Sequence, residues 1–346
     1  MRRALSWLVI LAMLWPRTFV QAEIVLPHDA GSHPDLRTEW WYVTGWLHAE
    51  DGRNFGFQIT FFRSRNEESA ENPSRFAPHQ IILAHAAISD PSIGRLLGDQ
   101  RAARAGFGLA EALEGKTDVW IDNWSLRQSG DGYTLSLPAR DFRLALDFKP
   151  AQTPLLHGPG GLSRKGAGAD ASSHYYSLPQ LAASGTLTHQ DNSFSVTGTA
   201  WLDHEWSDSY LEQDAVGWDW TGLNLADGGA LMLFRIRARN GSVRWAGGTY
   251  RKPDGTLTWF KPVDIRFTPL RHWRSPRNGT RYPVAWRINA GTLEFELEPM
   301  MDDQENDARA TTGTIYWEGA VRAMEAGQEI GRGYLELTGY WRPLQL

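Results

Sequence analysis

A weak internal repeat constrains the fold of this 346-residue chain more than any other feature of its sequence. Trp41–Trp46 reads WYVTGW and matches WDWTGL at Trp218–Leu223, and each copy is followed by an Asp-Gly pair and an apolar run that ends in Phe-Arg. Two later landmarks recur in the same order, Trp124–Leu126 with Trp286–Ile288 and a Thr-Gly before Trp201 or Trp341. Landmarks repeated in one order predict two copies of one structural unit.

The segments between these landmarks alternate between apolar and polar residues, as half-buried strands do. The clearest example is Phe142–Phe148, in which four apolar residues alternate with Arg143, Ala145 and Asp147. Helical periodicity is scarce, and Ala102–Leu113 is the best candidate for a short helix. We therefore predict an all-β protein of two antiparallel units, each closing into a barrel because closure removes exposed strand edges.

The amino terminus has the features of a secretory signal peptide. Arg2 and Arg3 precede an apolar run, and Val20-Gln21-Ala22 forms a small-residue cleavage pattern. The run is short for a membrane span, although an uncleaved anchor is the alternative. We expect residues 1–22 to be removed after Ala22, leaving a periplasmic or secreted protein without a transmembrane span. The expected domains are 23–207 and 208–346, with the boundary in a polar run.

Composition excludes several classes of protein. The chain has no cysteine, so disulfides and cysteine-ligated metals cannot stabilise an exported fold, and the core must come from apolar residues that include 17 Trp, 14 Phe and 10 Tyr. The formal charge is −5, with 35 basic and 40 acidic residues interspersed. No basic stripe is present that could neutralise phosphates, so nucleic acid is not an expected partner.

Standard catalytic motifs are missing from the sequence. No G-x-S-x-G nucleophile elbow occurs, and no glycine-rich nucleotide loop lies between a strand and a helix. His204-Glu205 resembles the start of a helical zinc motif, but Asp208 occupies the position of the required second histidine. We therefore expect no cofactor and no metal.

The segment Thr199–Gly222 combines tryptophans with acidic residues. In an extended strand, Trp201, Asp203 and Glu205 share one face, and Leu202, His204 and Trp206 share the other. An inward Asp203 beside Trp201 is poorly solvated and suited to donate a proton. The alternative is that Asp203 pairs with an arginine or caps the next segment. His174 and Tyr176 form a second cluster, for which ordinary strand packing is the alternative.

Five motifs carry a resemblance to a known family. They are Glu39-Trp40-Trp41-Tyr42 with Gly45, His157-Gly158-Pro159, Tyr175-Tyr176-Ser177, Ala200 to Ser207, and Gly217-Trp218-Asp219-Trp220. The chain resembles the AttH-like secreted proteins, which are related to the carotenoid 1,2-hydratases and to fungal lipocalin-like pericyclases. The resemblance covers nearly the whole mature chain. It implies two tandem lipocalin-like (calycin) antiparallel β-barrel domains with few short helices.

The resemblance also implies site residues. The proton donor of the hydratases corresponds to Asp203, with His174 as the second catalytic residue, and Trp201, Trp206 and Tyr176 as substrate-binding residues. The implied chemistry is protonation of a C=C bond, stabilisation of the carbocation by facing rings, and capture by water. The chain departs from the hydratases at Trp201, where they usually carry tyrosine, and at Glu205.

Two classes of function are therefore expected. The first is an exported protein that binds a long hydrophobic, isoprenoid or lipid-like ligand and hydrates it through Asp203, with His174 and Tyr176 facing the acid. The second is a non-enzymatic periplasmic carrier of lipid or another hydrophobic ligand, associated with an ABC exporter. Both need an aromatic pocket, but only the first needs the acid. Hydrolase or pericyclase activity stays open.

Overall fold

The computed structural model describes residues 23–344 except 70, 169, 210 and 213, and the predicted signal peptide lies outside these residues. Among the described residues every helix is a three-residue 3-10 turn, and the remaining elements are strands. The predicted all-β class is therefore confirmed. The helix expected at Ala102–Leu113 is wrong, because this segment contains the end of strand β4 (Arg95–Arg104) and β5 (Ala110–Ala112). Pairing of β4 with its neighbour outweighs the helical preference of its alanines.

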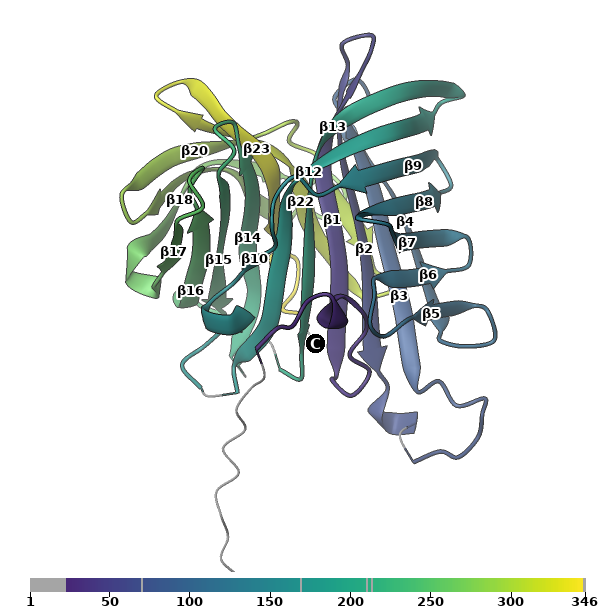
Figure 1. The fold of residues 1–346 in the computed structure, drawn as a ribbon. Coiled ribbons are helices and arrows are strands. Elements are labelled where there is room, and N and C mark those ends of the chain that lie inside the picture. Colours follow the sequence, from purple (N-terminus) through teal and green to yellow (C-terminus); the bar gives the residue numbers. More distant parts are fainter. Residues whose placement is uncertain (1–22, 70, 169, 210, 213, 345–346) are drawn as a thin grey trace, which may run out of the picture.

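The first half of the chain forms sheet A, a nearly closed barrel (Figure 1). Its path is β4-β3-β2-β1-β13-β12-β9-β8-β7-β6-β5, and β10 and β11 pair with β12. The strands not yet bounded are β1 (Thr38–Ala49), β2 (Asn54–Arg65), β3 (Gln80–Asp90), β6 (Asp118–Ile121), β7 (Trp124–Ser129), β8 (Gly132–Pro138), β9 (Phe142–Lys149), β10 (Leu155–Leu156), β11 (Leu162–Arg164), β12 (Ser172–His189) and β13 (Asn192–Ser207). The first Asp-Gly pair of the repeat, Asp51-Gly52, lies in the turn of the antiparallel hairpin of β1 and β2.

The second half forms the curved sheet B, with the path β17-β16-β15-β14-β23-β22-β20-β19-β18, and β21 pairs with β22. Its strands are β14 (Ala215–Leu225), β15 (Ala230–Ala238), β16 (Val243–Arg251), β17 (Leu257–Phe260), β18 (Ile265–Arg274), β19 (Arg281–Ala290), β20 (Leu293–Pro299), β21 (Glu305–Ala308), β22 (Thr314–Glu325) and β23 (Gln328–Leu337). The central pair β14 and β23 of sheet B corresponds to β1 and β13 of sheet A. This correspondence agrees with the internal repeat and with two lipocalin-like barrels.

The buried apolar side chains form three clusters. One fills sheet A, and another fills sheet B. The third lies between the sheets and combines Tyr42, Trp46 and Trp201 of sheet A with residues such as Trp220 and Phe234 of sheet B. We call this third region the inter-sheet layer. Figure 1 shows β1, β12 and β13 beside β14 and β22 in the middle of the molecule.

The two sheets approach each other closely where Gly56 of β2 meets sheet B. A Cβ on Gly56 would lie 2.7 Å from the Cβ of Ala320 and 2.8 Å from the hydroxyl oxygen of Tyr334. Nearby, the indole Nε1 of Trp46 donates a hydrogen bond of 3.1 Å to the carbonyl oxygen of Gly333. Because no side chain fits at residue 56, the glycine allows the sheets to pack directly.

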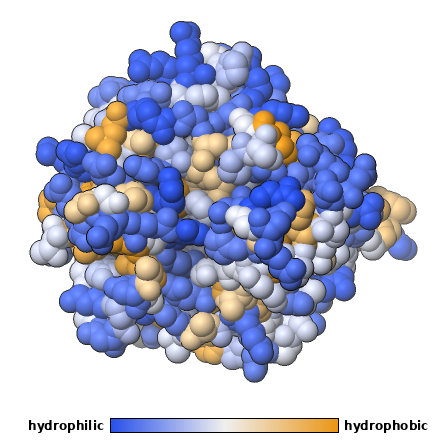
Figure 2. Space-filling view, turned by 90° about the horizontal axis from the view of Figure 1, so that it is seen from above, coloured by the Kyte–Doolittle hydropathy of each residue, from blue (hydrophilic) through white to orange (hydrophobic). Residues whose placement is uncertain are grey.

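The outer surface differs from this interior. Figure 2 shows a mostly hydrophilic face on which hydrophobic residues occur in small, separated groups. Within the described part of the chain, no helix has the length and apolar character that crossing a membrane requires.

Candidate functional site

Strand β13 presents its two sets of side chains to two different interiors. Leu202 and Trp206 belong to the cluster inside sheet A, whereas Trp201 belongs to the inter-sheet layer. Asp203 shares the face of Trp201, as the alternation of a strand requires. Asp203 is 2 % exposed, so its carboxyl group is held away from solvent between the two sheets.

Among the described residues, the groups that bond the Asp203 carboxyl directly are neutral hydrogen-bond donors. The indole Nε1 of Trp201 donates to Oδ1 over 2.6 Å, and the hydroxyl of Ser177 on β12 donates to the same oxygen. Burial raises the pKa of Asp203 to about 7, against the lowering effect of hydrogen bonds from Ser177, Trp201 and Tyr175. Among the described residues, none forms an ion pair with Asp203. Asp203 can therefore hold a proton near neutral pH.

Ser177 connects Asp203 to a buried histidine. The Ser177 hydroxyl lies 2.6 Å from Nε2 of His157, and Nδ1 of His157 lies 3.0 Å from the Thr249 hydroxyl of β16. Burial, with the charge of Lys165, holds the pKa of His157 well below its usual value. A neutral His157 that donates from Nε2 and accepts at Nδ1 satisfies every bond of this chain. Thr249, His157, Ser177 and Asp203 thus form a continuous hydrogen-bonded path.

The next acid on this face, Glu205, has a base of its own. Nζ of Lys165 lies 2.8 Å from Oε1 of Glu205, and both side chains are buried. The ammonium also lies 4.8 Å from the ring centre of Tyr175 and 4.4 Å from that of Phe234. The positive charge of Lys165 therefore neutralises that of Glu205. Asp203 and Glu205, only two residues apart on β13, thus lie in different electrostatic environments.

His174, Tyr176 and Trp206 lie on the opposite face of the sheet from Asp203. Tyr176 and Trp206 belong to the interior of sheet A, and His174 stacks on Trp206 with 5.4 Å between ring centres. On β12 the odd-numbered neighbours Tyr175 and Ser177 face the inter-sheet layer instead. The structure therefore brings Asp203 and Trp201 together but differs from the expectation that His174 and Tyr176 face them. The reason is the two-residue period of β12 and β13.

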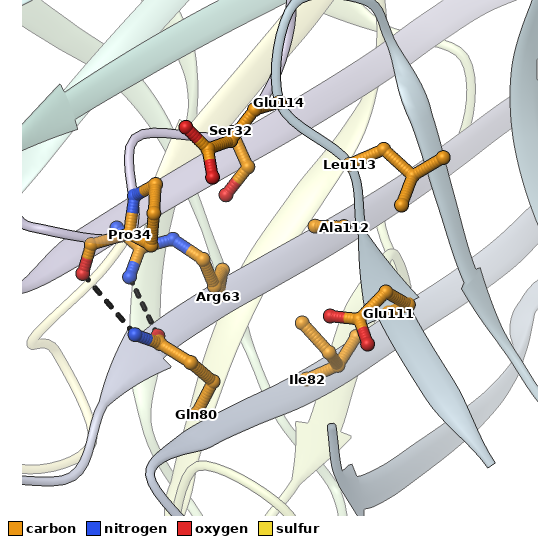
Figure 3. A pocket seen from close by; sticks show the side chains of 9 residues that line it. All are labelled: Ser32, Pro34, Arg63, Gln80, Ile82, Glu111, Ala112, Leu113 and Glu114. Atoms are coloured by element: carbon orange, nitrogen blue, oxygen red, sulfur yellow. Dashed lines mark hydrogen bonds between the residues drawn. The ribbon is translucent and has the colours of Figure 1, made fainter. Parts of the chain in front are cut away.

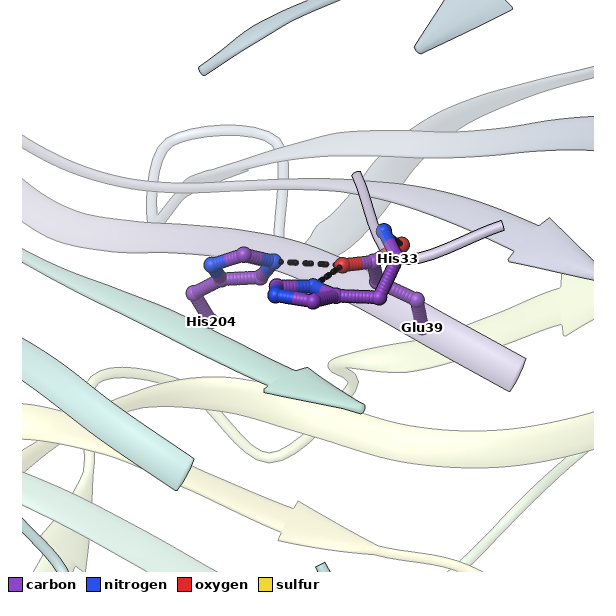
Figure 4. A group of neighbouring side chains, drawn as sticks. All are labelled: His33, Glu39 and His204. Atoms are coloured by element: carbon purple, nitrogen blue, oxygen red, sulfur yellow. Dashed lines mark hydrogen bonds and ion pairs between the residues drawn. The ribbon is translucent and has the colours of Figure 1, made fainter. Parts of the chain in front are cut away.

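Inside sheet A, a second buried carboxylate is surrounded by basic groups (Figure 4). Oε1 of Glu39 lies 2.7 Å from Nδ1 of His33 and 2.9 Å from Nε2 of His204. Oε2 accepts a hydrogen bond of 2.8 Å from Nε of Arg63. Burial alone would raise the pKa of Glu39, but the bonds from His204 and His33 and the charge of Arg63 hold it well below its usual range.

His33, Glu39 and His204 are also the described residues whose arrangement resembles a metal site. One potential ligand atom from each lies within 4.8 Å of the others. However, Arg63 occupies the second oxygen of Glu39, and Tyr176 lies 3.3 Å from the remaining nitrogen of His204. Each group already has a hydrogen-bond partner, so the set fits a buried ion-pair network better than a metal centre.

A pocket of about 200 Å³ lies at one end of sheet A, beside this network (Figure 3). Ser32 and Arg63 line the pocket, and both also donate hydrogen bonds to Glu39. Gln80, another lining residue, accepts a hydrogen bond from Arg63. Ile82 and Leu113 supply apolar surface. The acids Glu111 and Glu114 also line the pocket, so polar and apolar groups are mixed around it (Figure 3).

The sequence analysis did not select several residues around Asp203. Tyr42 lies opposite Asp203 in the register of β1 and β13, and Ser177 lies opposite it on β12. Tyr175 accepts a hydrogen bond of 3.0 Å from the Trp220 indole. The alternation of β12 could have identified Tyr175 and Ser177. His157 could not be assigned, because its position depends on how the loop before β11 folds.

The fold and this site define a class: a double-barrel, lipocalin-like β protein with an unpaired acid buried between its sheets. The chain belongs to the AttH-like family, whose model matches residues 18–340. The crystal structure of a candidate AttH protein, NE1406 of Nitrosomonas europaea, has 49% sequence identity and a TM-score of 0.88, covering 95% of this chain and 100% of that one.

Two solved structures with lower identity share the fold. Kievitone hydratase from Nectria haematococca has 13% identity and a TM-score of 0.71, with 94% of this chain and 95% of that chain covered. CghA, solved with Sch210972, has 13% identity and a TM-score of 0.56, with 88% and 89% covered. No curated protein matches the chain in sequence.

Proposed function

We propose that the protein is exported, binds a long hydrophobic molecule of isoprenoid or lipid-like character in the inter-sheet layer, and adds water to one of its C=C bonds with Asp203 as proton donor. One observation carries the proposal. Asp203 is 2 % exposed, lies beside the rings of Trp201 and Tyr175, and has no ion-pair partner among the described residues. An acid in this environment keeps its proton near neutral pH and can transfer it to carbon.

The reaction has two steps. Asp203 gives its proton to one alkene carbon, which leaves a carbocation on the other carbon and a carboxylate on the protein. Water then bonds to the carbocation and loses a proton, which returns to Asp203. The rings of Trp201, Tyr175 and Trp220 offer electron-rich faces to the cation. Hydrogen bonds from Trp201 and Ser177 stabilise the transient carboxylate, and the path through Ser177 to His157 can exchange its proton.

The family membership and the shared fold support this proposal. The chain belongs to the AttH-like family, and it shares its fold with a structure named as a hydratase. His174 of β12 and Trp206 of β13 stack on each other on the face of the sheet opposite Asp203, so in this proposal they support the site from behind and do not touch the substrate. The amino-terminal sequence pattern supports export.

A non-enzymatic carrier is the second candidate, and the pocket at the end of sheet A favours it. That pocket of about 200 Å³ combines Arg63, Ser32 and the acids Glu111 and Glu114 with apolar residues, and its polar groups could hold the polar end of a lipid. A carrier of this kind would pass its ligand to or from a partner such as an ABC exporter. It would not need the proton of Asp203.

The test is to incubate the purified protein with isoprenoid and lipid extracts and to search by mass spectrometry for bound molecules and for products heavier by one water. We expect wild type to form such a product, and Asp203→Asn to bind the same molecule without converting it. Glu296→Gln, an exposed acid on sheet B, is the control. A ligand that wild type binds but never converts, and that Arg63→Gln releases, would instead establish the carrier.

A further inference from the structure

Two exposed phenylalanines from separate loops lie against each other at the surface of sheet A. Phe76 belongs to the segment between β2 and β3, and Phe107 belongs to the turn between β4 and β5. Phe76 is 68 % exposed and Phe107 is 51 % exposed. Their rings stack with 5.4 Å between centres and 4° between planes. Single exposed apolar residues are ordinary, but large rings gathered from separate loops form a patch of the kind that indicates an interaction site.

The backbone of Phe107 has an unusual conformation. Its φ is 58°, and the flanking Gly106 and Gly108 have φ of 92° and 74°. Glycine adopts this left-handed region without strain, whereas a bulky aromatic residue does not. Backbone strain and exposure to water both oppose a phenylalanine at this position. The ring therefore serves a contact with another molecule better than it serves the folded chain.

Arg104, at the end of β4, holds both rings in place. Its Nη1 donates a hydrogen bond of 2.7 Å to the carbonyl oxygen of Phe76, and its Nη2 donates to those of Arg75 and Ala77 over 3.2 and 3.1 Å. The guanidinium carbon of Arg104 also lies 4.6 Å from the ring centre of Phe107. A surface that is fixed before binding loses little conformational freedom when it binds.

The charged groups that contact the two rings are basic. The guanidinium carbon of Arg75 lies 5.7 Å from the ring centre of Phe76 and 5.5 Å from that of Phe107. Among the described residues, Arg75 and Arg104 have no ion-pair partner, and the acid Glu67 of the same loop pairs with Arg65. Exposed aromatic rings beside cations suit a phospholipid surface, because the rings enter the headgroup region and the cations meet lipid phosphates.

A second copy of the chain fits this surface less well. A two-fold symmetric contact places the same patch on both sides, so Arg75 and Arg104 would face the same cations of the other copy. A stable interface also buries about 1,200–2,000 Å². Two phenylalanine side chains supply about 300–500 Å². A bilayer requires no such area, and its phosphates complement the arginines.

We propose that Phe76 and Phe107, together with Arg75 and Arg104, dock the protein onto a phospholipid bilayer that contains anionic lipid. We call these four residues the docking patch. The rings provide most of the binding by leaving water, and Arg75 and Arg104 add attraction to the lipid phosphates. Docking is independent of hydration by Asp203.

The docking patch adjoins the pocket at the end of sheet A. The backbone N–H of Ala105, next to Arg104, donates a hydrogen bond of 2.8 Å to the carbonyl oxygen of Gln80, which lines the pocket. Leu113, another lining residue, is 37 % exposed, and Leu109, between Phe107 and Leu113 along the chain, is 51 % exposed. A docked protein therefore holds this pocket close to the bilayer, where hydrophobic molecules are dissolved.

The test is flotation of the mature chain, residues 23–346, with lipid vesicles, because the apolar run within residues 1–22 would itself bind lipid. One set of vesicles contains equal parts of phosphatidylcholine and phosphatidylglycerol, and the other contains phosphatidylcholine alone. We expect wild type to bind the mixed vesicles about threefold to thirtyfold more tightly, a moderate ratio because the exposed acids Glu68 and Glu71 lie on the same loop as Arg75. No binding to the mixed vesicles would overturn the proposal.

Variants then locate the contact. Phe76→Ser/Phe107→Ser should weaken binding to the mixed vesicles by about tenfold or more. The matched control is Leu257→Ser/Trp259→Ser, which removes two exposed apolar side chains from β17 and should bind like wild type. Arg75→Gln should weaken binding to the mixed vesicles by about fivefold and leave binding to phosphatidylcholine unchanged. Equal binding by the two double variants would place the contact elsewhere and contradict the proposal.

Phe107→Asn separates docking from a structural role of the ring. Asparagine adopts positive φ more readily than phenylalanine, so its urea midpoint should equal or exceed that of wild type while vesicle binding falls by about threefold or more. A lower midpoint with unchanged binding would assign the ring to the fold. A wild-type dimer that Phe76→Ser/Phe107→Ser dissociates, measured by sedimentation without lipid, would make the patch an interface between copies and also overturn the proposal. Asp203→Asn should bind vesicles like wild type, so failure of docking is distinguishable from failure of hydration.

Discussion

Glu39 and Asp203 are both buried carboxyl groups on paired central strands of sheet A, yet their environments are opposite. Glu39 faces the interior of sheet A and bonds His33, His204 and Arg63. Asp203 faces the inter-sheet layer and has neutral donors only. The pKa of Glu39 is accordingly held low and that of Asp203 is raised to about 7. The comparison indicates that Glu39 stabilises the fold as a permanent anion, whereas Asp203 is arranged to change its charge.

The largest expected effect is the loss of the Glu39 anion. Glu39→Gln leaves the buried guanidinium of Arg63 without its counter-charge, so we expect a loss of about 3–5 kcal/mol in the free energy of unfolding at pH 7. Urea denaturation followed by tryptophan fluorescence measures it. Glu296→Gln, which breaks an exposed pair with Arg287, should cost less than about 1 kcal/mol. A similar small cost for Glu39→Gln would show that the network is not needed for stability.

The pH dependence of stability should differ in sign between the two acids. The folded-state pKa of Glu39 is lowered, so its contribution is present above its unfolded pKa and is lost as the pH falls. The folded-state pKa of Asp203 is raised to about 7, so between pH 4 and 7 the folded protein keeps the Asp203 proton that the unfolded chain has lost, and stability falls as the pH rises across this range. Asparagine carries no such charge. Asp203→Asn should therefore gain stability relative to wild type across this range, by up to about 4 kcal/mol.

Denaturation of wild type and Asp203→Asn at a series of pH values provides this test, because the difference between the two proteins cancels the titration of all other groups. Asp302→Asn, an exposed acid paired with Arg271, is the control and should show no comparable trend. If the difference stays constant between pH 4 and pH 8, Asp203 does not titrate near neutrality and cannot be the proposed proton donor.

The sequence predicted the parts of this structure that follow from local periodicity. The strand pattern and the division of β13 into two faces are set by neighbours along the chain, because side chains of a strand alternate. The internal repeat indicated two related units because its landmarks recur in the same order in both halves of the sequence. The helix expected at Ala102–Leu113 failed because pairing with β3 outweighs the preference of its alanines.

The rest of the site depends on contacts between distant segments. His157 joins Ser177 only because the segment before β11 folds against β12, and no local pattern encodes that contact. Trp206 was grouped with Asp203 because it is three residues away along the chain, and His174 because the family resemblance implied it. Strand geometry places both on the opposite face of the sheet from Asp203.

The smallest expected effect concerns the bond between Ser177 and Asp203. The Ser177 hydroxyl favours the carboxylate form, so Ser177→Ala should raise the pKa of Asp203 further, by about one unit. The midpoint of the pH-dependent stability difference between Ser177→Ala and Ser177→Ala/Asp203→Asn should move upward by that amount. Ser193→Ala, on the exposed end of β13, should leave the midpoint in place. A midpoint that stays or falls would mean that burial alone sets the pKa of Asp203. In that case the path from His157 through Ser177 would have no part in holding its proton.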